Sequence, residues 1–261
     1  MRAMNIAATG MLAQQTNVEV ISNNIANMNT TAYNTRRPEF SDLLYQNVKR
    51  VGSTSSDNNT IVPSGIQLGL GVKTAAVYRI TEQGSMTNTG NTLDLAVQGK
   101  GYFQILLPSG ETSYTRAGAF QLSPSGQIVT QEGYTVQPGI TVPNNATGVS
   151  INASGQVQIK LDGQTAQSTA GQLQLATFPN EAGLEARGDN LFMETPSSGT
   201  PVVANPATTG VGSVLQGFLE SSNVNVVSEI TNLISAQRAY EMNSKVIQAS
   251  DEMMTSINQL K

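Results

Sequence analysis

The chain has 261 residues, a length that accommodates one large domain or two ordinary domains. Its formal net charge is −4, which gives no electrostatic reason for it to bind nucleic acid. The sequence contains neither Cys nor His, which excludes disulfides, thiol nucleophiles, thiolate or imidazole metal ligands, and a Ser–His–Asp triad.

Charged residues make up only 12% of the chain, against about 25% in typical soluble domains. Such a surface repels its neighbours weakly, which suits a subunit that packs among copies of itself. The first residues lack the continuous apolar run of a secretory signal peptide, and no stretch is apolar enough to cross a membrane. We therefore expect neither a cleaved signal peptide nor membrane insertion.

Residues 1–33 are predicted to contain an N-terminal helix, because apolar residues recur at spacings of three and four and so share one helical face. Gln14 is the polar exception within this stripe. The helix is expected to end within residues 27–31, whose Asn and Thr side chains compete with helical backbone bonds. The stripe comprises Met4, Ala7, Met11, Val18, Ile21, Ile25 and Met28.

Residues 222–261 predict a second, longer helix, since no Gly or Pro interrupts them. Asn225 is a suitable N-cap, and Glu229 lies in the first turn, where the helix dipole favours a negative charge. Asn243 and Ser250 fall within the apolar stripe, where polar residues tend to fix register and partner. The apolar members of this stripe are Leu233, Ala236, Tyr240, Ile247, Met254 and Ile257.

Matching stripes at the two ends of the chain indicate that the two helices pair as a coiled-coil-like domain. Two interpretations of this pairing remain open: an assembly seam between copies, or an ordinary helical hairpin that closes a monomeric domain. We assign the self-assembly seam to Met4, Met11, Val18, Ile21, Ile25, Leu233, Tyr240, Asn243, Ile247, Met254 and Ile257.

Residues 34–75 are predicted to be a linker with a short helix, a small polar tip at residues 52–59 and an extended β arm. The short helix is inferred from the spacing of Phe40, Leu43, Leu44 and Asn47. In the returning arm, apolar and other residues alternate with the period of a strand. These apolar residues, interpreted as a stiffening arm that reaches a neighbouring subunit, are Ile66, Leu68, Leu70 and Val72.

Residues 76–221 predict a β-rich outer domain, because short apolar runs alternate with Gly-rich turns such as residues 99–101 and 124–126. The density of strands and tight turns is typical of an antiparallel barrel-like or sandwich domain. The expected fold class is therefore α+β, with a many-stranded antiparallel β domain inserted between two long terminal helices.

The sequence shows no convergent catalytic, cofactor-binding or metal site. The glycines at residues 65–71 and 99–101 match no phosphate-binding template. Five acidic residues lie beside predicted turns, where solvated or capping roles are normal. Two of them could in principle form the carboxylate pair that a glycosidase uses. They are Asp94, Glu111, Glu132, Asp162 and Asp189. We expect no enzyme and no cofactor, with a glycan-cleaving enzyme as an alternative.

Several stretches resemble flagellar rod and hook proteins. Residues 222–229 and 237–245 resemble the C-terminal signature of that family, and residues 23–27, with Thr30 and Tyr33, its N-terminal signature. The β-domain motifs of the family are similar to residues 93–103, 114–120 and 190–192. Where the family commonly has Gly after the Asn-rich turn, this chain has Ala32, which raises the question of an unusual backbone angle there.

The resemblance implies a structural subunit that assembles helically into the rod, and residues 43–46 and 63–67 favour the distal-rod branch, the drive shaft that carries torque across the periplasm to the hook. The implied partners are further copies of the chain, proximal rod and hook-side axial proteins, the surrounding peptidoglycan- and outer-membrane-level rings, and the type III export apparatus. Alternatives are a hook or proximal rod paralogue and, in a different class, a secreted β-rich adhesin.

Overall fold

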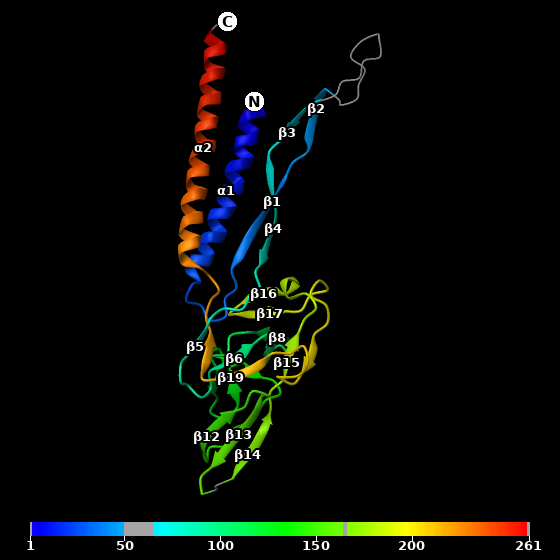
Figure 1. The fold of residues 1–261 in the computed structure, drawn as a ribbon, viewed down its shortest axis with the longest axis vertical. Helices are drawn as coiled ribbons and strands as arrows, with labels where there is room; N and C mark the ends of the chain where they lie inside the picture. The colour runs from blue at the N-terminus through cyan, green and yellow to red at the C-terminus, as the bar shows by residue number, and fades with distance from the viewer. Residues whose placement is uncertain (1, 50–64, 164–165, 260–261) are drawn as a thin grey trace. The chain divides into compact units, whose positions relative to one another are not determined.

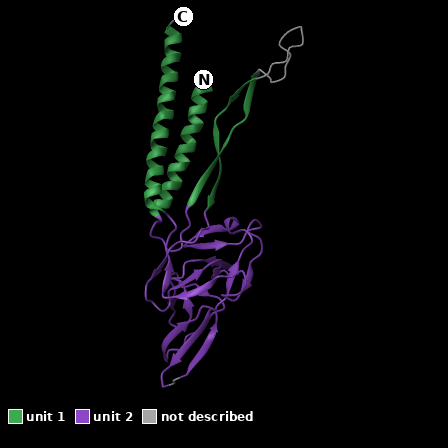
Figure 2. Ribbon diagram, viewed as in Figure 1, with its two compact units in different colours: residues 1–26, 36–79, 225–261 green, residues 27–35, 80–224 purple. Residues whose placement is uncertain are grey.

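The computed structural model describes residues 2–49, 65–163 and 166–259, so the predicted tip at residues 52–59 lies outside the described residues. The chain divides into two compact units (Figure 2). Unit 1 consists of residues 1–26, 36–79 and 225–261, and unit 2 of residues 27–35 and 80–224. The fold is α+β, with a helix at each end of a many-stranded antiparallel β region, as the sequence predicts.

Unit 1 contains the two long helices, α1 (Arg2–Ala26) and α2 (Val226–Gln259), which lie side by side (Figure 1). They are antiparallel, because the start of α2 meets the end of α1 through Glu229 and Asn24. The predicted N-cap is confirmed: Oδ1 of Asn225 accepts hydrogen bonds from the backbone N–H groups of Val227 and Ser228, at 3.1 and 3.2 Å. No described helix has the length and apolarity needed to span a bilayer.

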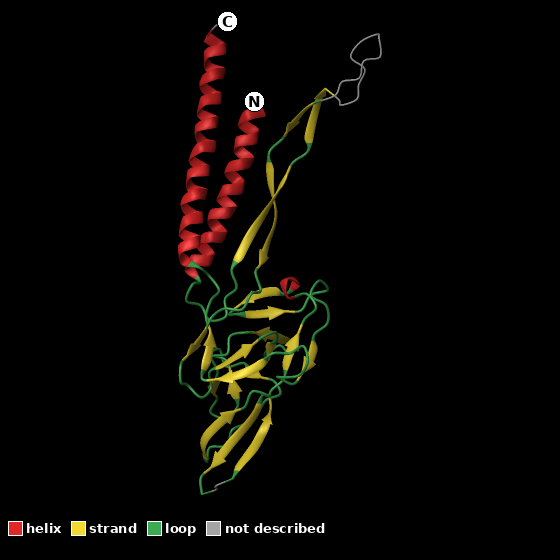
Figure 3. Ribbon diagram, viewed as in Figure 1, coloured by secondary structure: helices red, strands yellow, loops and turns green. Residues whose placement is uncertain are grey.

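The other described residues of unit 1 form a two-stranded antiparallel ribbon, which we call the arm (Figure 3). At its base, β1 (Arg36–Asp42) pairs with β4 (Val72–Arg79), and beyond this pair β2 (Tyr45–Lys49) pairs with β3 (Ile66–Gly69). Leu70 and Gly71 join β3 to β4.

The short helix expected from Phe40, Leu43, Leu44 and Asn47 is wrong, because the structure places these residues in β1, in β2 and between them. Hydrogen bonds to β3 and β4, which lie later in the chain, decide the conformation. Apolar spacing over so few residues does not distinguish a helix from a strand. Pro38 fits a ribbon, where a strand has one neighbour and one open edge.

Unit 2 is built on a nine-stranded antiparallel sheet. Its main path runs through β16 (Glu185–Gly188), β17 (Leu191–Met193), β8 (Thr112–Thr115), β7 (Tyr102–Leu106), β11 (Thr135–Val136), β10 (Ile128–Val129) and β9 (Gln121–Leu122). β15 (Leu175–Thr177) also pairs with β7, and its other edge pairs with β18 (Val202–Ala204).

Smaller sheets complete unit 2. A three-stranded sheet contains β12 (Ala146–Ile151), β13 (Gln156–Leu161) and β14 (Gln167–Gln172). Two further pairs join β6 (Leu95–Gln98) to β19 (Ser213–Gln216), and β5 (Met86–Asn88) to β20 (Phe218–Glu220). One 3-10 turn, η1, spans Glu181–Gly183.

The core of unit 2 forms where β6 and β7 are buried along most of their length. Phe103 and Phe120 meet edge-to-face with ring centroids 5.1 Å apart, and Leu95, Ile105 and Ile128 are almost fully enclosed with them. Buried aromatic pairs of this kind add about 0.5–1.5 kcal/mol beyond their area. Unit 2 therefore has a hydrophobic core of its own.

Residues 27–35 belong to unit 2, whereas the sequence attached them to the N-terminal helix and the linker. Helix α1 ends at Ala26, and Asn27 then forms a turn in which its Oδ1 accepts a hydrogen bond from the Thr30 hydroxyl at 3.1 Å. Ala32 adopts a left-handed conformation with φ of 56°, is buried, and donates its N–H to the Glu220 carbonyl at 2.8 Å. The backbone angle that favours glycine is thus kept with alanine in place.

Replacing Ala32 with Gly is expected to change the free energy of unfolding by less than about 1 kcal/mol. Relief of the left-handed strain, about 1–2 kcal/mol, is offset by chain entropy of about 0.4–1 kcal/mol and by loss of a buried methyl. Ala32→Val should instead destabilise by more than about 2 kcal/mol, because a β-branched residue strongly disfavours positive φ and this site is closed. Urea unfolding followed by circular dichroism measures both; a neutral Val variant would contradict this reading.

Candidate functional site

The predicted seam residues divide between two environments in unit 1. On α1, Ile21 is buried and the other seam residues are half-buried. On α2, Leu233, Asn243 and Ile247 are half-buried, whereas Tyr240, Met254 and Ile257 are exposed. The stripe is thus partly covered between Leu233 and Ile247, with Tyr240 exposed among them, while its far end on α2 remains uncovered in the single chain.

One close approach and one hydrogen bond fix how α1 and α2 align. A Cβ atom at Gly10 would lie 2.9 Å from Nδ2 of Asn243, so the two helices approach closely at this point. Near the other end of α1, Nδ2 of Asn24 donates hydrogen bonds to Oε2 of Glu229 at 3.2 Å and to the Arg36 carbonyl at 2.8 Å. The Arg36 N–H donates back to Oδ1 of Asn24 at 3.0 Å.

Glu229 therefore has a second structural role beside its place in the first turn of α2. Its side chain is buried against the Asn24 amide, in addition to lying in the first turn of α2. A displaced register would leave this carboxylate buried without its donor, which is strongly unfavourable. The Asn-rich signature at residues 23–27 marked Asn24 as part of a family motif, but the sequence alone did not show that its partner is Glu229.

A second apolar stripe on α2 is exposed to solvent; the sequence assigned two of its members, Val246 and Met253, to the edge of the first stripe and left the others unassigned. Ile230 and Ile234 stand one turn apart, as do Met242 and Val246. Scattered exposed apolar residues are normal, but a line of them along one helix indicates a surface that another protein covers. The stripe comprises Val227, Ile230, Ile234, Met242, Val246 and Met253.

The arm also exposes apolar side chains. Ile66, Leu68 and Leu70 retain 51%, 44% and 39% of their surface, and Val72 is half-buried. Leu44, Tyr45 and Val48 on the opposing strand segment are exposed as well. A hydrogen bond and the charge of Asp42 raise the pKa of Tyr45, which keeps its hydroxyl neutral.

The arm is attached to α1 at the junction of β3 and β4. The Val72 N–H donates to Oγ1 of Thr9 at 3.3 Å, and Gly71 adopts a φ of 115° where a Cβ would overlap that same oxygen. A groove of about 530 Å³ runs between α1 and this part of the arm, with Leu12, Ala13, Thr16 and Leu43 in its walls. The β1–β4 half of the arm is therefore held to α1, and the β2–β3 half extends beyond the point of attachment.

Unit 2 contains a buried ion pair between Arg116, which belongs to the sequence motif at residues 114–120, and Glu220. Nε of Arg116 donates to Oε2 of Glu220 at 2.6 Å, with only 7% and 2% of the two side chains exposed. The other guanidinium nitrogens donate to the carbonyls of Val97, Gly99 and Gly101, at 3.3, 2.7 and 3.2 Å. Arg116 therefore binds the loop that follows β6 to the strand that carries Glu220.

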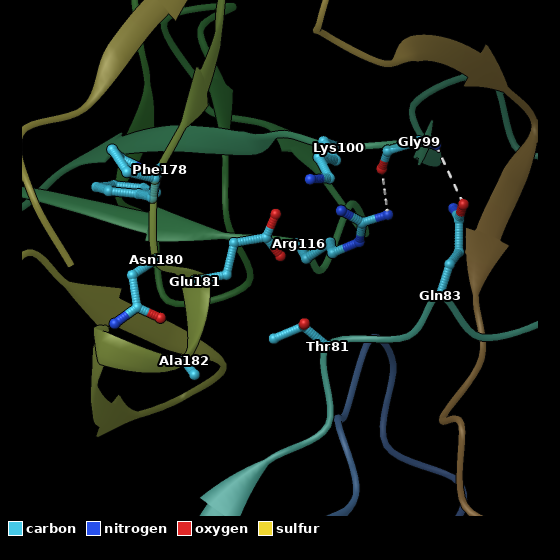
Figure 4. Close-up of a pocket in the computed structure, with 10 residues that line it drawn as sticks. Thr81, Gln83, Gly99, Lys100, Arg116, Phe178, Asn180, Glu181 and Ala182 are labelled. Atoms are coloured by element: carbon cyan, nitrogen blue, oxygen red, sulfur yellow. Dashed lines mark hydrogen bonds between the residues drawn. The ribbon is translucent and has the colours of Figure 1, made fainter.

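A cavity of about 390 Å³ lies beside Arg116 (Figure 4). Its lining includes Lys100, Asn180 and Glu181, and Glu181 accepts a hydrogen bond from the Tyr102 hydroxyl at 3.2 Å. Gln83 accepts from the Gly99 N–H at 3.1 Å and donates to the Val97 carbonyl at 2.6 Å. Glu181 is the single carboxylate in the lining, so the cavity does not provide the pair that glycoside hydrolysis requires.

The five acidic candidates do not converge. Asp94 accepts hydrogen bonds from Thr89 and Asn91 at 2.6 and 2.9 Å within one turn, and Glu111 pairs with exposed Arg187 at 3.0 Å. The other three, Glu132, Asp162 and Asp189, occupy turns. Across residues 2–49, 65–163 and 166–259 there is no cluster of three or more side chains suited to a metal ion.

Tyr114 lies in a second buried cluster of unit 2. Burial raises the pKa of its hydroxyl, and the neighbouring Glu194 carboxylate raises it further. The ring packs edge-to-face on Phe178, with centroids 4.8 Å apart. A neutral tyrosine in such a cluster serves packing and not proton transfer.

Comparisons with known proteins cover both ends and the middle of the chain. Three family models match: "Flagella basal body rod protein" at residues 4–33, "Flagellar hook protein FlgE/F/G D1 domain" at residues 96–159, and "Flagellar basal body rod FlgEFG protein C-terminal" at residues 215–260. The matched segments contain α1, the strands around Arg116 and α2.

Individual relatives align along the full length. A protein of Caulobacter vibrioides named flagellar basal-body rod protein FlgG is 61% identical over 261 residues, which is 100% of both chains. A protein of Agrobacterium fabrum with the same name is 52% identical, covering 99% of this chain and 98% of its own. A Bacillus subtilis protein named flagellar hook-basal body complex protein FlhP is 30% identical over 100% of both chains.

Proposed function

The chain belongs to the flagellar basal-body rod protein family, and on this basis we propose that it forms the distal rod, the straight shaft that carries torque across the periplasm to the hook. Within this family it is a structural subunit of the rod in the flagellar basal body, and it is not an enzyme. The relatives favour neither a hook or proximal rod paralogue nor an adhesin.

The rod is a polymer of this chain, held together by its helices. The α1–α2 pair, with its spacing of three and four and its Gly10–Asn243 approach, acts as a coiled-coil-like building block. The exposed second stripe of α2 then meets other copies, and each large side chain that becomes buried contributes about 1.5–3 kcal/mol. Such head-to-tail contacts between unlike surfaces generate open helical filaments.

Further partners follow from the place of the rod in the basal body. They are the proximal rod and hook-side axial proteins, the rings at the peptidoglycan and outer-membrane levels, and the type III export apparatus. The support for these partners is family membership together with the low charge of the chain, which lets surfaces approach with weak repulsion.

The arm is the part that makes the polymer straight and stiff. The observation that carries this step is the exposure of Ile66, Leu68 and Leu70, which the described part of unit 1 does not cover. A neighbouring subunit supplies that cover. An arm that is held to Thr9 where β3 meets β4, and that binds a neighbour beyond this point, resists sliding between copies as the shaft bends. A loosely attached surface loop is the alternative.

Replacing Ile66, Leu68 and Leu70 together with Ser tests the arm. Burial of the three side chains contributes at most about 4–9 kcal/mol before ordering is subtracted, so the variant is expected to form polymers that are curved and flexible. Electron micrographs of negatively stained polymers give the curvature and persistence length.

The matched control replaces Val202 and Val203 with Ser, which removes exposed apolar surface from β18 in unit 2. This control is expected to form straight polymers. Straight polymers of unchanged persistence length from the arm variant would show that the arm does not supply the stiffness.

A further inference from the structure

Four covalent connections join the two units, after residues 26, 35, 79 and 224. On the unit 2 side, these connections belong to three segments: residues 27–35, the segment that begins at Ile80, and the segment that ends at Val224. Any load that passes along the chain between the helices and the β strands has to enter unit 2 through these segments. How firmly unit 2 holds them together is therefore a mechanical property of the subunit.

Asn223 binds all three segments through one side chain. Its Oδ1 accepts hydrogen bonds from the Thr35 N–H at 2.7 Å and from the Thr35 hydroxyl at 2.6 Å. Its Nδ2 donates to the carbonyls of Ile80 at 3.2 Å and Glu82 at 2.9 Å. An asparagine amide has two acceptor positions and two donor hydrogens, and here all four are used.

Backbone hydrogen bonds also connect these three segments, and we call the connected region the joint. The Asn223 N–H donates to the Tyr33 carbonyl at 3.3 Å, and the Ile80 N–H donates to the Thr35 carbonyl at 2.9 Å. No other short side chain can replace the amide: aspartate lacks the donors, and serine has one donor on a shorter arm. The residue type at this position is therefore set by its bonding pattern.

Glu220 links the joint to the core of unit 2. Its carbonyl accepts from the Ala32 N–H at 2.8 Å, its Oε1 accepts from the Gly84 N–H at 3.0 Å, and its Oε2 accepts from Arg116. The strands run so close here that a Cβ at Gly84 would lie 1.9 Å from the Ser221 carbonyl oxygen. The three segments are thus tied to the loop that Arg116 holds.

We propose that Asn223 is the positioning residue that locks these three segments into a single joint, and that this joint determines how stiffly the rod passes torque between the two units of each subunit. The proposal rests on the proposed function for its mechanical part. When the hydrogen bonds of Asn223 are formed, a load that enters by one connection is shared by all four. When they are broken, each segment rotates independently about its own backbone bonds.

The first test is amide hydrogen exchange on the full chain. In Asn223→Ala, the Thr35 amide loses its acceptor and the Ile80 segment loses its donor, so both amides are expected to exchange about tenfold faster or more. Amides of β7 and β8 should keep their protection, since the core is untouched. The matched control is Asn152→Ala, which removes an amide that also accepts two hydrogen bonds and donates one, in the β12–β13 turn.

Two further variants separate the parts of the lock. Asn223→Asp retains acceptors for Thr35 but directs an oxygen at the carbonyls of Ile80 and Glu82, so exchange at Ile80 should rise as much as in the Ala variant. Thr35→Val removes only the hydroxyl bond and is expected to have a smaller effect. If Asn223→Ala fails to fold, Thr35→Val provides the test. An Ile80 amide that exchanges as slowly in this variant as in the natural chain would contradict the proposal that the three segments are held together.

The mechanical part is measured on polymers. Asn223→Ala polymers are expected to form with normal yield but with a persistence length about twofold shorter or more, while Asn152→Ala polymers match the natural chain. Unchanged exchange at Thr35 and Ile80 would overturn the lock, and unchanged persistence length would overturn its mechanical role. If the natural chain itself forms no polymer, the proposed function fails, whereas the exchange data still test the joint.

Discussion

Ile247→Asp is expected to abolish polymer formation while unit 2 stays folded. Ile247 is half-buried in the stripe where α2 packs on α1, four residues after Asn243. The substitution removes about 1.5–3 kcal/mol of burial, leaves a cavity, and places an unpaired charge in the helix seam. Unit 2 has its own core, so the damage is confined to the helices.

Sedimentation and negative-stain microscopy measure the yield of polymer, and near-ultraviolet circular dichroism reports the tyrosine-containing core of unit 2. The matched control is Lys245→Ala, an exposed position on the same helix, which should leave the yield almost unchanged. An Ile247→Asp protein that polymerises as well as the natural chain would refute assembly through paired helices.

Arg116→Met is expected to lower the free energy of unfolding of unit 2 by about 3–5 kcal/mol, since breaking a buried pair leaves an uncompensated charge. Glu220, which is 2% exposed in the natural chain, would keep the backbone N–H of Gly84 as the remaining donor to its carboxylate among those described. The carbonyls of Gly99 and Gly101 would also lose the donors that hold their loop.

Urea unfolding of the full chain measures this loss. Arg187→Met removes an exposed pair with Glu111, where both side chains are 51% exposed, and should change stability by about 0–1 kcal/mol. The double variant Arg116→Met with Glu220→Gln should be less destabilised than the sum of the single variants, because no buried charge is left unpaired. Equal losses for the Arg116 and Arg187 variants would contradict the structural role of the buried pair.

The features that depend on residues close together in the sequence were predicted well. The two helices, the capping role of Asn225 and the break after α1 all depend on residues within a few positions of one another. The β character of the arm after residue 65 also follows from a local alternation. Phe40 and its neighbours were assigned wrongly because two partner strands that lie later in the chain, β4 and β3, determine their conformation.

The buried polar contacts could not be predicted for the same reason. Arg116 and Glu220 are 104 residues apart, Thr35 and Asn223 are 188 apart, and Asn24 and Glu229 are 205 apart. Each residue belongs to, or lies beside, a stretch that resembles the family, but resemblance marks a position without giving its partner. The list of acidic candidates accordingly included Asp94 and Asp162 and omitted Glu220, the most deeply buried carboxylate of unit 2.

The Asn24–Glu229 hydrogen bond and the close approach of Asn243 to Gly10 together fix the alignment of α1 and α2. Fourteen residues separate Gly10 from Asn24, and fourteen separate Glu229 from Asn243, so both contacts form only in one alignment of the helices. A slip by one turn would press Asn243 against a bulkier side chain and strand the Glu229 carboxylate. In a filament of identical copies, a subunit with misaligned helices would displace the subunit that binds to it. Because two contacts fix the alignment within each helix pair, the misalignment is prevented before the subunit joins the filament.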